Sequence, residues 1–156
     1  MLRKARITDV DAIHRLVNSC AAQGEMLPRS LAELYDNMRD YFVYEDEDSG
    51  KIGGTCALHI CWENLGEIRS LCVDEGLRRR GIGFELVTAC MDEAKQFGMD
   101  RLFVLTYRDD FFRRFGFSEV EKSELPHKIW TECINCPKFP RCDEIAMILD
   151  SASPHK

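Results

Sequence analysis

The sequence has few of the features that mark a membrane, secreted or nucleic-acid-binding protein. No apolar run approaches the roughly 20 residues that a transmembrane helix needs, and the basic N-terminus is not followed by the apolar segment of a signal peptide. Basic residues do not predominate, because the formal net charge is −6, which argues against nonspecific binding to nucleic acid. We therefore expect a cytoplasmic protein with no membrane or nucleic-acid partner.

Internal repeats, low-complexity segments and flexible linkers are also missing. A chain of 156 residues is most simply one domain with a substantial core, so we predict a single domain over residues 1–150 and a C-terminal tail over 151–156. Two nucleotide-binding motifs are absent as well. No Gly-Lys-Ser/Thr completes a P-loop, and no G-x-G-x-x-G forms a dinucleotide fingerprint.

The sequence does contain a basic turn with two glycines between a predicted strand and a predicted helix. The turn reads Arg78-Arg79-Arg80-Gly81-Ile82-Gly83 and follows the apolar run 68–73. Backbone N–H groups at a helix start carry partial positive charge and favour anions, and Gly81 and Gly83 let the backbone approach without interference from a Cβ atom. The turn predicts a phosphate site; the alternative is a basic surface turn before an ordinary helix.

Hydrophobic periodicity and turn residues predict the element order β-α-α-β-β-β-α-β-α-β-β. The strands are expected over 2–7, 42–44, 52–61, 67–73 and 102–106, from residue 117, and over 145–149, with helices from about residue 10, from 31, over 82–97 and over 110–115. Thr8 and Ser30 each begin a capping-box pattern, and Gly98 has the position of a C′ glycine. We expect Gly53-Gly54 to break the third strand.

The basic turn and a later segment resemble the GNAT superfamily of N-acetyltransferases. The turn fits the R-x-x-G-x-G/A pattern, and residues 112–117, which read Phe-Arg-Arg-Phe-Gly-Phe, are similar to the family's aromatic-x-x-x-Gly-Phe ending. The resemblance covers nearly the whole chain. It implies an α/β fold with a mixed, mostly antiparallel sheet flanked by helices, acetyl-CoA as co-substrate, and a homodimer as a family expectation.

The same resemblance implies how acetyl-CoA is held. The residues expected to bind its pyrophosphate are Arg78, Arg79, Arg80, Gly81, Ile82 and Gly83. Backbone N–H groups of Leu71, Cys72 and Val73 are expected to contact the thioester, because this strand bears a bulge in the family. Arg79 stands where the family commonly has glycine, and its side chain either reaches the 3′-phosphate of the cofactor or lies on the surface.

Several segments resemble a narrower group, the short single-domain bacterial N-acetylglutamate synthases. They are Gln23-Gly24, Arg29-Ser30, and residues 66–68, 102–106, 112–117 and 124–137. This resemblance implies transfer to the α-amine of L-glutamate, the first step of arginine biosynthesis. Three alternatives remain open: an acetyltransferase for another small amine or amino acid, a protein acetyltransferase, and a CoA-binding regulatory module without turnover.

Acetylation of an amine needs a group that takes the proton of the ammonium and a donor for the departing thiolate. The resemblance implies Glu67 as the general base; the alternative is a solvent-facing glutamate at a strand start. It implies Thr106 as the donor, because Phe112 occupies the position where many family members have a tyrosine. Thr106 is equally a strand threonine with high β-propensity, and Tyr107 is a neighbouring alternative.

Two carboxylates of a glutamate substrate call for basic partners, above all arginine. Arg29 matches a substrate-binding arginine of the synthases, and Lys128 and Arg141 are further candidates. For each of them the alternative is a solvated surface charge.

The eight cysteines fall into two groups. The first group lies in apolar periodic segments, where we expect small core residues with free thiols: Cys20, Cys56, Cys61, Cys72 and Cys90. The second group, Cys133, Cys136 and Cys142, offers three thiolates to zinc, with His127 or Asp143 as a fourth ligand. The alternatives are a free-thiol loop beside the substrate or a redox-sensitive pair, and we expect no metal.

Overall fold

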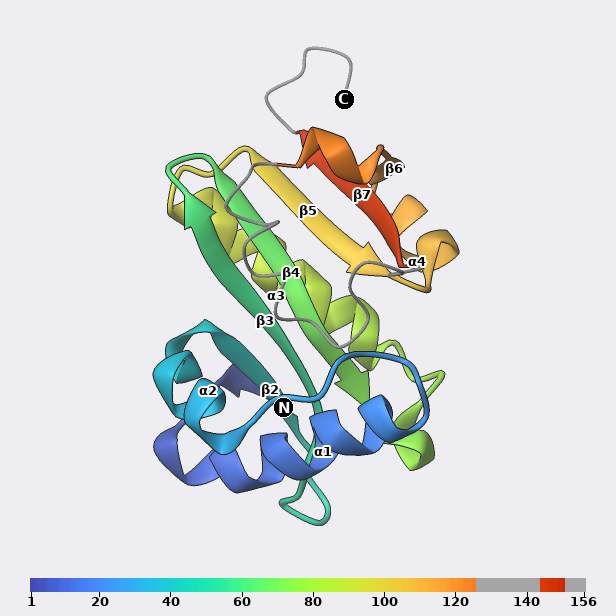
Figure 1. Cartoon of the computed structure of the whole chain (residues 1–156). Helices are drawn as coiled ribbons and strands as arrows, with labels where there is room; N and C mark the ends of the chain where they lie inside the picture. Colours follow the sequence, from blue (N-terminus) through green and yellow to red (C-terminus); the bar gives the residue numbers. More distant parts are fainter. Residues whose placement is uncertain (126–143, 151–156) are drawn as a thin grey trace. The chain divides into compact units, whose positions relative to one another are not determined.

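The structure, a computed structural model, describes residues 1–125 and 144–150, and it contains one seven-stranded sheet in the order β1-β2-β3-β4-β5-β7-β6 (Figure 1). The strands are β1 (Leu2–Lys4), β2 (Tyr41–Glu45), β3 (Ile52–Trp62), β4 (Leu65–Val73), β5 (Arg101–Thr106), β6 (Ser118–Glu119) and β7 (Ile145–Asp150). The β4–β5 pair is parallel, whereas β1–β2, β2–β3, β5–β7 and β6–β7 are antiparallel. The predicted mixed, mostly antiparallel sheet is therefore confirmed.

The helices complete the predicted element order. They are α1 (Val10–Ala22), α2 (Leu31–Asp36), α3 (Ile82–Gln96) and α4 (Asp109–Arg113), and the short 3-10 turns include η1 (Ile7–Asp9) and η3 (Glu75–Leu77). None of the helices in the described part of the chain is long and apolar enough to cross a membrane. Contacts divide the chain into two compact units: unit 1 is Met1–His59 with Ile68–Phe97, and unit 2 is Ile60–Glu67 with Gly98–Lys156.

In unit 1, α1 and α3 cover opposite faces of the strands (Figure 1). The buried stripe of α1, with Val10, Ile13 and Val17, packs against Tyr41 and Val43 of β2. Helix α3 buries residues spaced three or four apart, which is the period expected for one helix face: Ile82, Leu86, Val87, Cys90 and Ala94. It ends one residue earlier than predicted, and Gly98 follows at φ 79° as the expected C′ glycine.

One of the two predicted capping boxes is confirmed. Ser30 Oγ accepts a hydrogen bond from the N–H of Glu33 at 3.1 Å, and the N–H of Ser30 donates to Glu33 Oε1 at 3.3 Å. The prediction for Thr8 is wrong. The first strand ends at Lys4, the 3-10 turn η1 follows it, and Asp9 accepts the N–H of Arg6 at 2.7 Å. Arg3 Nη1 also donates to Asp9 Oδ2, at 2.7 Å.

The predicted break at Gly53-Gly54 does not end the strand, because β3 runs from Ile52 to Trp62. The glycines do mark an irregularity: Tyr44 lies opposite Gly54 and Glu45 opposite Ile52, so the register with β2 shifts at Gly53. The two glycines also make room for neighbours. A Cβ atom at Gly53 would collide with the side chain of Leu77 in η3, and one at Gly54 would lie 3.2 Å from Ile82 and Leu86 of α3. The pair thus lets the connection before the basic turn, and the start of the helix after it, pack closely on β3.

Unit 2 is built around β5, which has β4 on one side and β7 on the other. Gly66 and Glu67 of β4 lie opposite Leu102 and Phe103, and β5 pairs with β7 along its whole length. The core includes Cys61, Leu65, Phe103, Leu125 and Ala146. The aromatic residues of the predicted family ending pack edge to face, with the rings of Phe112 and Phe117 5.5 Å apart.

Three of the five cysteines predicted as small core residues are confirmed as buried and outside any disulfide: Cys56, Cys61 and Cys90. A hydrogen bond with Cys56, together with burial, raises the pKa of the Cys90 thiol well above its usual value. The prediction for the other two is wrong, since Cys20 and Cys72 form a disulfide. Their Cα atoms lie 6.4 Å apart, inside the range that a disulfide spans, because the end of α1 packs beside β4.

Candidate active site

The basic turn has the backbone that an anion site requires. Gly81 is the N-cap of α3 at φ 79°, a left-handed conformation that glycine adopts without strain. A Cβ atom at this position would meet no other atom within 4 Å, so space lies beside the backbone at the start of the helix. The first N–H groups of a helix have no acceptor within it. The residues present therefore fit a bound phosphate.

The three arginines of the turn differ in their surroundings. Arg79 and Arg80 are exposed and make no ion pair with any residue in the described ranges 1–125 and 144–150. Arg79 has φ 69°, so its backbone adopts a conformation that costs a non-glycine residue about 1 kcal/mol or more. That geometry explains why glycine is common at this position in the family that the turn resembles.

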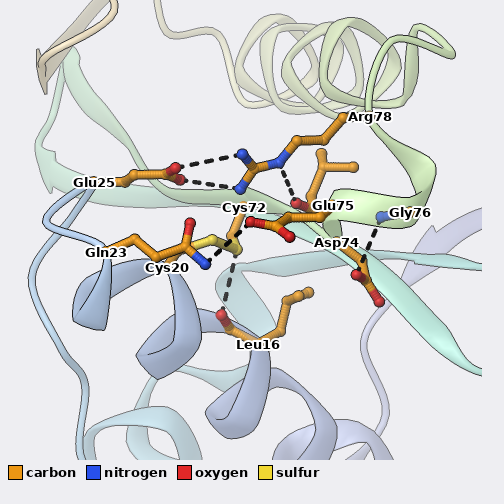
Figure 2. Close-up of a disulfide and its surroundings, with 10 residues drawn as sticks. Leu16, Cys20, Gln23, Glu25, Cys72, Asp74, Glu75, Gly76 and Arg78 are labelled. Carbon is orange, nitrogen blue, oxygen red and sulfur yellow. Dashed lines mark hydrogen bonds and ion pairs between the residues drawn. A yellow bond between two sulfur atoms is a disulfide. The ribbon is translucent and has the colours of Figure 1, made fainter.

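Arg78 fastens the turn to other parts of unit 1 (Figure 2). Its Nε donates to the carbonyl oxygen of Val73 at 3.0 Å, and its two Nη groups donate to the carboxylate of Glu25 at 3.4 and 3.2 Å. The guanidinium of Arg78 thus has protein partners on both sides, the carbonyl oxygen of Val73 and the carboxylate of Glu25. Glu25 was not singled out in the sequence, because a glutamate in a polar segment gives no signal of a distant partner.

The strand before the turn is distorted where the family resemblance implies a bulge. Ser70 has φ 59° in the middle of β4, a left-handed conformation that interrupts the regular pleat of a strand. Its hydroxyl lies 3.1 Å from the phenol oxygen of Tyr41. Leu71, Cys72 and Val73 follow directly, so the distortion changes the direction of the backbone of the three residues expected to contact the thioester.

Arg29 lies at the entry to α2 with its backbone held by α1. Asn18 Oδ1 accepts the N–H of Arg29 and Asn18 Nδ2 donates to its carbonyl oxygen, both at 3.2 Å, and the guanidinium donates to Glu33 at 3.2 Å. Arg69 of β4 was missed by the sequence reasoning. Burial raises the pKa of Tyr41, while the Ser70 hydrogen bond and the positive charges of Arg29 and Arg69 oppose this rise. The positive charges of both arginines thus act on the pKa of one buried phenol.

The two predicted catalytic residues lie in unit 2. Glu67 is the third residue of β4, lies opposite Phe103 and is only 8% exposed, which excludes the alternative of a solvent-facing glutamate. Thr106 ends β5 and is equally buried; its Oγ1 accepts the N–H of Arg108 at 2.8 Å. A hydroxyl that accepts one bond still has its proton to donate. Thr106 lies three residues beyond Phe103, or about 10 Å along the strand.

The remaining predicted site residues lie outside the described residues. They are Lys128 and Arg141, proposed for the substrate, and Cys133, Cys136 and Cys142, weighed as zinc ligands with His127 and Asp143. Among the residues that the structure does describe, no three His, Cys, Asp or Glu side chains come together as a metal site would require.

Unit 1 also contains an open cavity of about 680 Å³ beside the turn. Residues of α1, of the β2–β3 turn and of the β4–η3 connection line it, among them Cys20, Gln23, Val73, Glu75 and Arg78. Cys20 of the disulfide and Arg78 of the ion pair with Glu25 thus both line this cavity.

A distorted strand, a glycine turn and the N-terminus of a helix follow one another in this order and together offer a site for an anion. A model of the acetyltransferase (GNAT) family matches residues 10–117, and the chain belongs to this family. It is an N-acetyltransferase with acetyl-CoA as co-substrate, which agrees with the CoA bound in related structures.

Two relatives match over most of their length. An uncharacterized N-acetyltransferase of Chlorobaculum tepidum is 42% identical over 147 residues, 94% of each chain. An amino-acid acetyltransferase of Mycobacterium tuberculosis is 37% identical over 133 residues, which are 85% of this chain and 76% of the relative.

Solved structures agree with the fold. A Mycobacterium tuberculosis protein in complex with CoA and NLQ has a TM-score of 0.83 and 31% identity, covering 96% of this chain and 98% of its own. The N-acetylglutamate synthase of Neisseria gonorrhoeae, complexed with coenzyme A and N-acetyl-glutamate, has the same TM-score at 24% identity. It shares only the fold, and this chain covers 35% of that longer one.

Proposed function

We propose that this protein transfers the acetyl group of acetyl-CoA to the α-amine of L-glutamate and so forms N-acetyl-L-glutamate, the first intermediate of arginine biosynthesis. The observation that carries the proposal is the similarity to the amino-acid acetyltransferase of Mycobacterium tuberculosis over 85% of this chain. That relative's name specifies an amino acid as acceptor. Glutamate is the specific acceptor proposed here, and it is supported by the arginines of unit 1.

The reaction is a direct transfer. The neutral α-amine attacks the thioester carbonyl carbon, an oxyanion forms, and the carbon–sulfur bond breaks to release the thiolate of CoA. An α-ammonium group has a pKa of about 8, so most of it must lose a proton before it can attack. Glu67 is proposed to accept this proton, directly or through water, because a carboxylate near the amine can act as its general base.

Three further groups have proposed roles. Backbone N–H groups of Leu71, Cys72 and Val73 would stabilise the oxyanion, and donors aimed at developing charge are often the largest catalytic contribution. Thr106 would donate its hydroxyl proton toward the departing sulfur. A thiolate is a weak base compared with an alkoxide, so a hydrogen bond from a hydroxyl suffices where other family members use a tyrosine.

The acceptor is recognised by its carboxylates in this proposal. Arg29 is held in place by Asn18, and its ion pair with Glu33 is i,i+4 and partly exposed, so its exchange for a substrate carboxylate costs little. Arg69, near the same Tyr41 phenol, is a second cation for the same region. Lys128 and Arg141 remain candidates for the second carboxylate.

The test is a substrate panel. The purified protein is incubated with acetyl-CoA and single amino acids, and the acetylated products are quantified by mass spectrometry. We expect kcat/KM for L-glutamate to exceed that for L-glutamine, L-aspartate and L-lysine by at least tenfold. In Arg29→Lys the KM for glutamate should rise more than the KM for acetyl-CoA, because a lysine cannot bind a carboxylate in a bidentate manner.

A flat profile, or a preference for a basic or apolar amino acid, would contradict glutamate as acceptor and leave an acetyltransferase for another amine. The exposed Arg15→Lys serves as a matched control and should leave both KM values unchanged.

A further inference from the structure

The disulfide joins two parts of unit 1 that have proposed roles in binding. One is the end of α1, which holds the backbone of Arg29, and the other is β4, whose residues 71–73 are expected to contact the thioester. Cys20 is in the last turn of α1, and Cys72 is one of the three residues of β4 expected to contact the thioester. Figure 2 shows the bond between helix and strand, directly beside the ion pair of Glu25 and Arg78. It joins residues that are 52 positions apart in the sequence. Interactions between neighbours in the sequence therefore cannot hold these two residues together.

Contacts from the end of α1 hold the segment between α1 and α2. Asn18 binds the backbone of Arg29. Cys20, two residues after Asn18, is bonded to Cys72 of β4. Gln23 donates to Glu75 at 3.4 Å, and Glu25 binds Arg78 at 3.2 Å. The last two links are polar and partly exposed, so each contributes little on its own. The disulfide is the covalent link among the three.

We propose that the Cys20–Cys72 disulfide is a redox switch that sets the affinity of this enzyme for acetyl-CoA and for its acceptor. In the oxidised form the end of α1 is fixed to β4, and the Arg78–Glu25 pair keeps the turn in its binding conformation. In the reduced form the end of α1 is released from β4. The backbone of Arg29 and the backbone of residues 71–73 then lose the preorganisation that binding needs. The acceptor part rests on the proposed function; the acetyl-CoA part does not.

The chemistry is thiol–disulfide exchange with a dithiol. A thiolate of the dithiol attacks Sγ of Cys20, the bond to Cys72 breaks, and Cys72 leaves as a thiolate that takes up a proton. The second thiol of the reductant then attacks the mixed disulfide and releases Cys20. Two electrons and two protons pass from the dithiol to the two cysteines, and an oxidised dithiol reverses the sequence.

Access and location support a switch over a purely structural bond. Both cysteines are only 3% exposed, yet Cys20 lines the cavity of about 680 Å³, through which a thiolate can reach its sulfur. Under the cytoplasmic location expected from the sequence, reducing conditions make disulfides transient and mostly catalytic or redox-sensing. Cys56 and Cys90, which are also buried in unit 1, remain free thiols and provide an internal reference.

The experiment compares wild-type enzyme poised with oxidised and with reduced dithiothreitol. Free thiols are counted by maleimide labelling and mass spectrometry, acetyl-CoA binding is measured by calorimetry, and rates follow the acetylated product by mass. The Kd for acetyl-CoA and the KM for glutamate should rise about fivefold on reduction, a loss of preorganisation, while kcat changes less than twofold. The dithiothreitol ratio at which the Kd for acetyl-CoA is halfway between its two values should be the ratio at which two additional thiols appear.

Cys20→Ser should have the reduced values under both conditions, and Cys56→Ala should respond like the wild type. Equal affinities in the two states, with the thiol count proving reduction, would overturn the switch and leave a structural bond. If neither state acetylates glutamate but the Kd for acetyl-CoA still differs between them, the proposed acceptor fails and the switch stands. Chemical labelling that finds both thiols free under every condition would also overturn it.

Discussion

The side chain of Leu77 occupies the space that a side chain at Gly53 would need. Leu77 ends the 3-10 turn η3, and the basic turn begins at the next residue. The glycine on β3 therefore sets how closely the connection before the basic turn packs on the sheet.

Gly53→Ala should displace Leu77 and with it the turn at 78–83. We expect a loss of about 1–3 kcal/mol in the free energy of unfolding, as for overpacking of a core, together with weaker binding of acetyl-CoA. Denaturant unfolding and calorimetry measure the two effects. Gly76→Ala is the matched control, because a Cβ atom at that position of η3 would meet nothing within 4 Å. Equal behaviour of the two variants would contradict this account.

The ion pair of Arg78 and Glu25 predicts an indirect role for Arg78. Glu25→Gln should weaken acetyl-CoA binding by a few-fold, in the same direction as Arg78→Ala, since a partly exposed pair is worth up to about 1 kcal/mol. Binding is measured by calorimetry at two salt concentrations, with the exposed Glu47→Gln as control. If Arg78 instead held the phosphate directly, removal of its competitor Glu25 would tighten binding.

Glu67 predicts a separation of binding from turnover. Glu67→Gln keeps the shape of the buried side chain but removes the proton acceptor, so kcat should fall by roughly 10²–10⁴-fold, while the Kd for acetyl-CoA stays within twofold. Single-turnover rates and calorimetry test this, with the exposed Glu63→Gln as control. Full activity in Glu67→Gln would remove this residue from the mechanism.

Asp9 predicts how stability depends on pH. Burial alone would raise its pKa, but hydrogen bonds from Arg3 and from the N–H of Arg6 outweigh burial and lower the pKa below its usual value. The folded state therefore favours the ionised form. Its contribution is present above the unfolded pKa of about 3.9 and is lost as the pH falls through the lower folded value.

The measurement is urea unfolding of wild type and Asp9→Asn between pH 7 and pH 3. The difference in unfolding free energy should be largest near pH 7 and shrink below about pH 4. Asp36→Asn, an exposed aspartate in α2, should show no such trend. A difference that grows toward acid would mean that the sign of the Asp9 contribution is wrong.

The order of the elements, and the glycine turn that opens α3, could be predicted from the sequence because both depend on local patterns. The apolar spacing of α3, the Ser30 cap and the Gly98 stop are set within a few residues of the chain. The predicted core thiols Cys56, Cys61 and Cys90 followed from the apolar segments that contain them.

Features that depend on contacts between distant segments could not be predicted. The disulfide pairs residues separated by 52 positions, and Gly53 meets Leu77 only after β3 and η3 have packed. The left-handed Ser70 has no signal in its residue type, because serine is not typical of that conformation. The wrong prediction for Thr8 has a local cause: Asp9, the next residue, accepts the N–H of Arg6 and forms an ion pair with Arg3.

We infer that the backbone at 79–83, at the start of α3, binds the pyrophosphate of acetyl-CoA. The most direct measurement is a titration of the isotope-labelled protein with acetyl-CoA, followed through its backbone amide resonances. We predict the largest shifts at Gly81, Ile82 and Gly83 and at Leu71 to Val73, and their loss in Gly81→Val. Saturable shifts confined to other segments, with these amides unchanged, would contradict the account.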